Sequence, residues 1–274
     1  MTVAHGSRAA TSNLLTRVGW RGSRRARYRA STLVLQLAAG LAPPRSRARA
    51  QALTALGVTC KDRGRFAQAE AAYLAAAAEL IALPQRDPAA AAALEHNFAG
   101  LAHARGDYTG GLPHARAAIA LRATIEQVDP TALAADQAVL AALLAGAGRR
   151  DEARATFFRV LAITEDAYGP DHYETAVVLH NLAALESDSE QAVQLQQRAL
   201  TIKRRTLGDA HPEVAAIRAN LGVLLERAQR PEAARHEYES ALAILQQRWG
   251  PDHPATTACR TNLQALAARH LDHA

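Results

Sequence analysis

Apolar and small residues recur along this sequence at the spacing of a helix face. A small residue is followed four positions later by an aromatic one in Ala69/Tyr73, Ala153/Phe157 and Ala234/Tyr238. Residues four apart lie on the same side of an α-helix, so these pairs predict helices with one buried face. Corresponding positions hold small residues at Gly111 and Ala192, and branched apolar residues follow at Leu121, Ile163, Ile202 and Ile244.

The pattern repeats with a period of 42 residues. Gly64, Gly106 and Gly148 are spaced by 42, as are Asn220 and Asn262, whereas the step from Asn181 to Asn220 is only 39. Each unit predicts two helices joined by a turn, for which glycine supplies a left-handed backbone. We therefore predict an all-α solenoid of about five helical hairpins, with residues 254–270 as a terminal helix.

Local signals predict where several helices begin. Asp87 and Asp129 stand directly before prolines and are suited to cap the following helix. In the 39-residue step, Ser187 and Glu190 have the spacing of a capping box, which predicts an early start of the second helix there.

The order of these positions carries a family resemblance. The stretch ALTIKRRTLGDAHPEVAAIRANLGVLLERAQRPEAARHEYESALAILQQRWGPDHP resembles the 42-residue tetratricopeptide repeats of kinesin light chains and their bacterial relatives. The resemblance covers roughly residues 50–270 and is strongest over 131–265. It implies a right-handed α-α superhelix whose first helices line a concave groove for peptides or partner domains. It does not imply kinesin binding, which needs segments outside the repeats.

Charge separates the N-terminal region from the rest. Residues 1–50 contain ten arginines, and no Asp or Glu precedes Asp62. We expect residues 1–45 to be a basic arm or a degenerate repeat, since Asn13-Leu14 lies 42 residues before Ala55-Leu56. Residues 46–270 form the expected solenoid. The arm is either an unstructured tail or a segment for nucleic acid or anionic membrane, because basic runs bind phosphates without a fold.

Composition indicates the compartment. The two cysteines, Cys60 and Cys259, are far apart and form no CxxC pair, which fits a reducing environment. No apolar run approaches the roughly 20 residues of a membrane span. We therefore expect a cytoplasmic protein, with Cys60 as a small core residue.

The sequence contains no recognisable catalytic motif. It has no HExxH, GxSxG or GxxxxGK[ST]. Asp171-His172, His211 and Asp252-His253 suggest metal ligands, but they recur at the repeat period, which favours a structural role in the loops. We expect no enzyme activity, no cofactor and no metal site.

The resemblance places a set of polar side chains in the groove. An asparagine inside a helix is not there for helix propensity, and its amide can donate and accept towards a peptide backbone or bridge adjacent helices. The predicted groove residues are His96, Asn97, His103, Ala142, His180, Asn181, Asn220, Arg227 and Asn262.

The middle unit differs from its neighbours. It presents Ala138, Val139, Ala142 and Ala145 at the groove positions, which leaves room for one bulky apolar side chain of a partner, held on either side by Asn97 and Asn181. The predicted function is a protein–protein interaction scaffold or adaptor. The alternatives are a peptide-sensing regulator and a nucleic-acid-associated protein acting through its basic arm.

Overall fold

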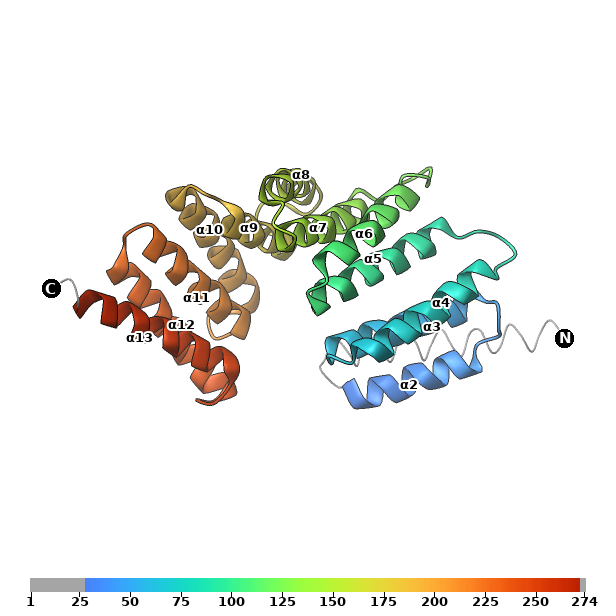
Figure 1. Ribbon diagram of the computed structural model, residues 1–274, viewed down its shortest axis with the longest axis horizontal. Coiled ribbons are helices and arrows are strands. Elements are labelled where there is room, and N and C mark those ends of the chain that lie inside the picture. The colour runs from blue at the N-terminus through green and yellow to red at the C-terminus, as the bar shows by residue number, and fades with distance from the viewer. Residues whose placement is uncertain (1–27, 272–274) are drawn as a thin grey trace. The chain divides into compact units, whose positions relative to one another are not determined.

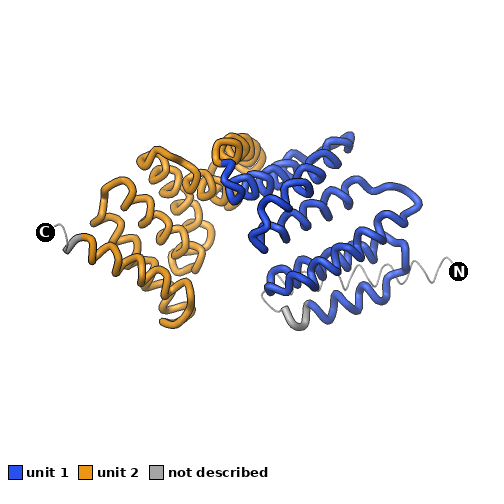
Figure 2. Tube along the Cα trace, in the orientation of Figure 1, with its two compact units in different colours: residues 1–149 blue, residues 150–274 orange. Residues whose placement is uncertain are grey.

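The computed structural model describes residues 28–271, which form 12 helices and no strand (Figure 1). This agrees with the predicted all-α solenoid of helical hairpins. The chain divides into two compact units, residues 1–149 and residues 150–274 (Figure 2). The division falls within the third predicted hairpin, so its two helices belong to different units. Of the basic arm or degenerate repeat predicted at residues 1–45, residues 1–27 lie outside the described residues, and Tyr28–Leu41 form the first described helix.

Unit 1 contains two complete hairpins and two further helices. Helix α3 pairs with α4, α5 pairs with α6, α2 packs on α3, and α7 packs on α6. The bounds are α2 Tyr28–Leu41, α3 Arg47–Asp62, α4 Phe66–Ile81, α5 Pro88–Arg105, α6 Tyr108–Arg122 and α7 Pro130–Gly146.

Unit 2 also contains two complete hairpins. Helix α9 pairs with α10 and α11 with α12, while α8 packs on α9 and α13 on α12. The bounds are α8 Arg150–Tyr168, α9 Tyr173–Leu185, α10 Ser189–Leu207, α11 Pro212–Arg227, α12 Pro231–Trp249 and α13 Pro254–Leu271.

The predicted small and aromatic positions form the core of the hairpins. Ala69, Tyr73, Ala234 and Tyr238 are fully buried. A Cβ atom on Gly222 of α11 would lie 2.6 Å from the Tyr238 ring, so glycine is what lets this ring lie against the first helix. Cys60 is buried in the cluster that contains Tyr73, as predicted, and burial raises the pKa of its thiol.

Two of the predicted helix starts are confirmed and one is wrong. Asp87 accepts the backbone N–H of Ala90, and Asp129 accepts that of Thr131. The capping box at Ser187 does not form, because Asp188 is the N-cap of α10 and accepts the N–H groups of Glu190 and Gln191. Residues 186–188 bridge α9 and α10 without a glycine.

The side chain of Glu186 takes the place of the glycine turn in this short step. It is buried and accepts the N–H groups of Ser187 and Asp188 at 2.9 and 3.2 Å. Arg154 of α8 donates to the same carboxylate at 3.0 Å. The three missing residues shorten α9, which has 13 residues against 16 in α11, while the connection itself is as long as its neighbours and is held by a charged anchor.

Candidate functional site

The predicted groove residues all lie on the first helices of the hairpins or on α13. In unit 1, α5 carries His96, Asn97 and His103, and α7 carries Ala142; in unit 2 the remaining residues are His180, Asn181, Asn220, Arg227 and Asn262. Four of the unit 2 residues line two recesses on either side of α11. Asn97 and Asn181 belong to different units.

The first recess lies between α9 and α11 and has a volume of about 300 Å³. Val177, Ala216 and Ile217 give it an apolar lining, and His180 and Asn220 contribute polar groups. The complete lining is Tyr173, Val177, His180, Lys203, Glu213, Ala216, Ile217 and Asn220. Its size and character suit an apolar side chain with one or two hydrogen bonds beside it.

Three side chains from three helices form a charged cluster in this recess. Lys203 of α10 is buried, donates to Glu213 at 2.6 Å, and lies 3.4 Å from the centre of the Tyr173 ring. Tyr173 also donates to Glu213, at 2.8 Å. Burial raises the pKa of Glu213, but the hydrogen bonds from Lys203 and Tyr173 outweigh it, so the pKa lies below its ordinary value. The positive charge of Lys203 is therefore balanced by the carboxylate of Glu213 within the protein.

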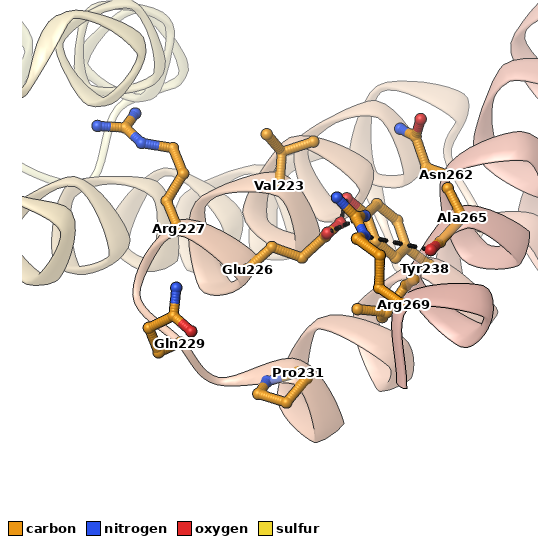
Figure 3. A pocket seen from close by; sticks show the side chains of 10 residues that line it. Val223, Glu226, Arg227, Gln229, Pro231, Tyr238, Asn262, Ala265 and Arg269 are labelled. Carbon is orange, nitrogen blue, oxygen red and sulfur yellow. Dashed lines mark hydrogen bonds and ion pairs between the residues drawn. The ribbon is translucent and has the colours of Figure 1, made fainter. Parts of the chain in front are cut away.

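The second recess lies between α11 and α13 and has a volume of about 640 Å³ (Figure 3). It is the more polar of the two. Its lining is Val223, Glu226, Arg227, Gln229, Pro231, Tyr238, Asn262, Ala265, Leu266 and Arg269. Asn262 and Arg227 of the predicted groove set thus belong to the lining of this recess.

Glu226 is the centre of a hydrogen-bond network in the second recess. Tyr238 donates to one carboxylate oxygen at 2.6 Å and Arg269 donates to the other (Figure 3). Burial, together with the bond to Glu226, raises the pKa of Tyr238 above its ordinary value. Arg227 instead donates to the backbone oxygen of Glu186 at 3.2 Å. Arg269 balances the charge of Glu226, so the lining of the second recess carries one further positive charge, that of Arg227.

Helix α11 connects the two recesses. Its residues in the recess linings follow a 3–4 spacing, which places them in one line along the helix. They are Glu213, Ala216, Ile217, Asn220, Val223, Glu226 and Arg227. The N-terminal part of this line faces the first recess and the C-terminal part faces the second.

Two histidines bridge neighbouring helices, a role that the sequence left open for the asparagines. His96 of α5 bonds to Asp136 of α7 at 2.9 Å, and His180 of α9 bonds to Gln196 of α10 at 3.0 Å. Asn97 donates to the backbone oxygen of Ala93 in its own helix. Burial raises the pKa of Asp136, but bonds from His96 and Arg122 outweigh it and leave the pKa low.

A recess in unit 1 was not predicted from the sequence. It has a volume of about 300 Å³ and lies between α3, α4 and α5. Alanines dominate its lining, which consists of Arg47, Ala50, Gln51, Thr54, Ala55, Leu80, Ala90 and Ala93. Alanines at helical spacing on α3 were the available signal, but they also occur throughout the core.

The histidines near the unit ends serve as helix caps. The Nδ1 atoms of His172 and His211 accept the N–H groups of Glu174 and Glu213, and His253 accepts that of Ala255. These bonds support the structural role predicted for the clusters. Within residues 28–271, no three His, Cys, Asp or Glu side chains form a group suited to a metal ion. No helix in that range is long and apolar enough to cross a membrane.

Comparisons with known proteins identify the repeat. The family model of the tetratricopeptide repeat matches residues 131–190 and 184–247. Among curated proteins, none matches the sequence. Of solved structures, BtubC (BKLC) from P. vanneervenii is similar over 81% of this chain and 85% of its own, with 24% identity and a TM-score of 0.60.

Two further structures share the fold. A Podosopora anserina protein described as a kinesin light chain with nearly identical TPR-like repeats is 21% identical, with a TM-score of 0.58, over 69% of this chain and 90% of its own. The apo form of RapI is 15% identical, with a TM-score of 0.62, over 80% of this chain and 83% of its own. At these identities the likenesses concern the fold.

Proposed function

Because this chain is a tetratricopeptide repeat protein of the kinesin-light-chain-like type, we propose that it is a protein-interaction scaffold or adaptor that binds an extended partner segment along α11. The observation that carries the proposal is the pair of recesses that α11 joins. The role is one of binding, without catalysis.

The dimensions suit a short peptide. From Glu213 to Arg227 the line on α11 spans fourteen positions, or about 21 Å at the rise of an α-helix. An extended chain covers that distance with about six residues. An apolar side chain would enter the recess between α9 and α11, and the backbone would bond to Asn220 and Asn262.

The test uses a displayed library of random seven-residue peptides, selected on the full chain and then measured by calorimetry. Ala216→Phe fills the first recess and should abolish binding of the selected peptides. Asn220→Ala and Asn262→Ala should each weaken it by about tenfold, the equivalent of one or two hydrogen bonds. Gln194→Ala, on the exposed face of α10, is the matched control and should have no effect.

Other results would assign peptide binding to a different surface of the protein. If Ala216→Phe leaves binding intact in a folded protein, the peptide does not use α11. If Ala142→Phe abolishes binding and Ala216→Phe does not, the peptide binds at the third repeat, at helix α7, where the sequence predicts the apolar anchor. Selected peptides with no apolar residue would contradict the role assigned to the first recess.

A further inference from the structure

Gln196 of α10 occupies a core position that holds an aromatic residue in the repeats on either side. It follows Phe157 by the 39-residue step and precedes Tyr238 by one 42-residue period, and all three side chains are fully buried. An amide in place of an aromatic ring costs solvation free energy unless both of its ends are hydrogen-bonded. The partners of this amide therefore indicate what the position contributes.

Both ends of the Gln196 amide have a partner on another helix. Its Nε2 donates to the backbone oxygen of Ile217 in α11 at 2.8 Å, and its Oε1 lies 3.0 Å from Nδ1 of His180 in α9. A carbonyl oxygen can only accept a hydrogen bond, so the contact with Ile217 fixes which end of the amide faces α11. The oxygen is the end that faces His180.

The orientation of Gln196 determines which nitrogen of His180 carries the proton. Because the amide oxygen accepts, Nδ1 of His180 is the donor. A neutral imidazole has one N–H, so Nε2 then carries a lone pair and is an acceptor. The ring is half-buried and lines the recess between α9 and α11, and among residues 28–271 its Nε2 has no hydrogen-bond partner. The recess therefore presents an acceptor.

Other histidines of the chain show that the partner of Nδ1 sets the tautomer. The Nδ1 atoms of His172 and His211 accept backbone N–H groups, so the neutral rings carry their proton on Nε2, the opposite form. His96 in unit 1 resembles His180, since its Nδ1 lies 2.9 Å from the buried carboxylate of Asp136. His180 combines this form with a place in a recess lining.

Given the peptide-binding function proposed above, we propose that Gln196 is a positioning residue for recognition, which fixes Nε2 of His180 as an acceptor for the anchoring side chain of the partner. The apolar lining of the recess receives the body of that side chain, and His180 accepts a hydrogen bond from an O–H or N–H group on it. An anchor of the same shape without a donor leaves Nε2 unpaired and binds more weakly.

The same recess contains two competing acceptors. Oε2 of Glu213 already accepts from Lys203 and Tyr173, but the carboxylate has a second oxygen, and the amide of Asn220 also lines the recess. A donor bound to either group would be insensitive to the tautomer of His180. Substitution of Gln196 therefore separates His180 from both alternatives.

The first measurement is the ring nitrogen chemical shifts of the histidines in the full chain without peptide, at about pH 8, where unperturbed imidazole is neutral. His180, assigned by its loss in His180→Ala, should carry its proton on Nδ1, whereas His172 and His211 carry theirs on Nε2. Gln196→Leu should shift His180 towards the second form. Gln197→Leu, at the next, exposed position of α10, is the matched control and should leave His180 unchanged. A proton on Nε2 of wild-type His180 would overturn the proposal.

The second measurement uses peptides selected on the wild-type chain. Their apolar anchor should carry an O–H or N–H group. Exchanging it for the closest residue without that group, such as phenylalanine for tyrosine or valine for threonine, should weaken binding to the wild type about tenfold. In Gln196→Leu the same exchange should change affinity by less than about twofold. A tenfold effect that persists in this variant would assign the hydrogen bond to Glu213 or Asn220 and overturn the proposal.

The experiments distinguish this role from the peptide-binding function on which it rests. Peptides that bind along α11 with anchors lacking a donor would overturn the role of Gln196 and leave the proposed function standing. If no peptide is selected, the proposed function fails and the recognition role fails with it. If Gln196→Leu does not fold, Gln196→Met removes the same acceptor, and the wild-type spectrum and the anchor exchange still decide.

Discussion

The two units close the same kind of hairpin with different residues. In unit 1, Gly64 and Gly106 end the first helices in a left-handed conformation, with φ of +68° and +75°. In unit 2, Gln229 adopts this conformation, with φ of +56°, and residues 186–188 replace the turn altogether. Most of these hairpins therefore use a left-handed residue at the turn, but the fold also accepts the α9–α10 connection, in which residues 186–188 include none.

The helix starts differ in the same way. In unit 1, Asp87, Asp107 and Asp129 cap helices with carboxylates. In unit 2, His172 and His211 use the Nδ1 atom of the imidazole as the acceptor. A carboxylate and an unprotonated imidazole satisfy the same orphan N–H groups. They respond differently to acid, because protonated imidazole has no acceptor.

The largest expected effect is at the charged turn of unit 2. Glu186→Ala leaves Arg154 and two backbone N–H groups without their buried acceptor, so unit 2 should lose about 2–4 kcal/mol of unfolding free energy. Urea denaturation measures the change. Glu190→Ala is the control, since Glu190 is exposed and its ion pair with Arg230 is long, at 3.6 Å. Equal effects of the two changes would contradict the anchoring role of Glu186.

Acid should weaken the same turn. Burial raises the pKa of Glu186, but the N–H groups of Asp188 and Ser187 and the charge of Arg154 outweigh it and hold the pKa below its ordinary value of 4.5. The folded pKa is lower than the unfolded one, so this stabilisation is present at neutral pH and is lost as pH falls through the folded pKa. Glu186→Ala should remove this part of the acid dependence.

The glycine turns should respond with opposite signs in the two units. Gly106→Ala introduces a Cβ at a positive φ and should destabilise unit 1 by about 1 kcal/mol. Gln229→Gly removes such strain and should stabilise unit 2 by up to about 1 kcal/mol. Gly100→Ala inside α5, where a Cβ meets only Lys61 at 4.0 Å, should be stabilising. Thermal denaturation of the three variants decides whether φ controls the sign.

A smaller difference is expected at the buried tyrosines. Tyr238→Phe removes the hydroxyl that donates to Glu226 and should cost about 1 kcal/mol. The hydroxyl of Tyr73 is buried with no hydrogen-bond partner within the described part of the chain, so Tyr73→Phe should be neutral or stabilising. Denaturant midpoints of the two variants provide the comparison, and equal losses would contradict it.

The smallest effect concerns the histidine cap of α11. His211→Asp should leave stability at pH 8 within about 0.5 kcal/mol, since both side chains can accept an N–H bond. His211→Ala, which has no acceptor, should instead cost about 0.5–2 kcal/mol. Melting temperatures of the three proteins measure the difference, and equal values for the wild type and His211→Ala would contradict the capping role.

The sequence by itself determined the helices, their 42-residue order, the left-handed glycines and the aspartate caps. The 42-residue order is visible in the sequence as a whole, and the helices, turns and caps depend on residues within about one helical turn, so local chemistry is sufficient to predict them. The capping box at Ser187 was wrong for a related reason. Asp188, one residue later, offers a carboxylate to two N–H groups, and the buried Glu186 fixes the preceding turn.

Only the tertiary structure decided which side chains meet. Arg269 reaches Glu226 from a position 43 residues away, and Arg154 reaches Glu186 across 32 residues. The recesses on either side of α11 and the contacts that Gln196 makes with α9 and α11 depend equally on how neighbouring helices pack. Leucine and alanine have the same local preference whether they are buried or exposed, so helical periodicity gives the elements while packing selects the surface.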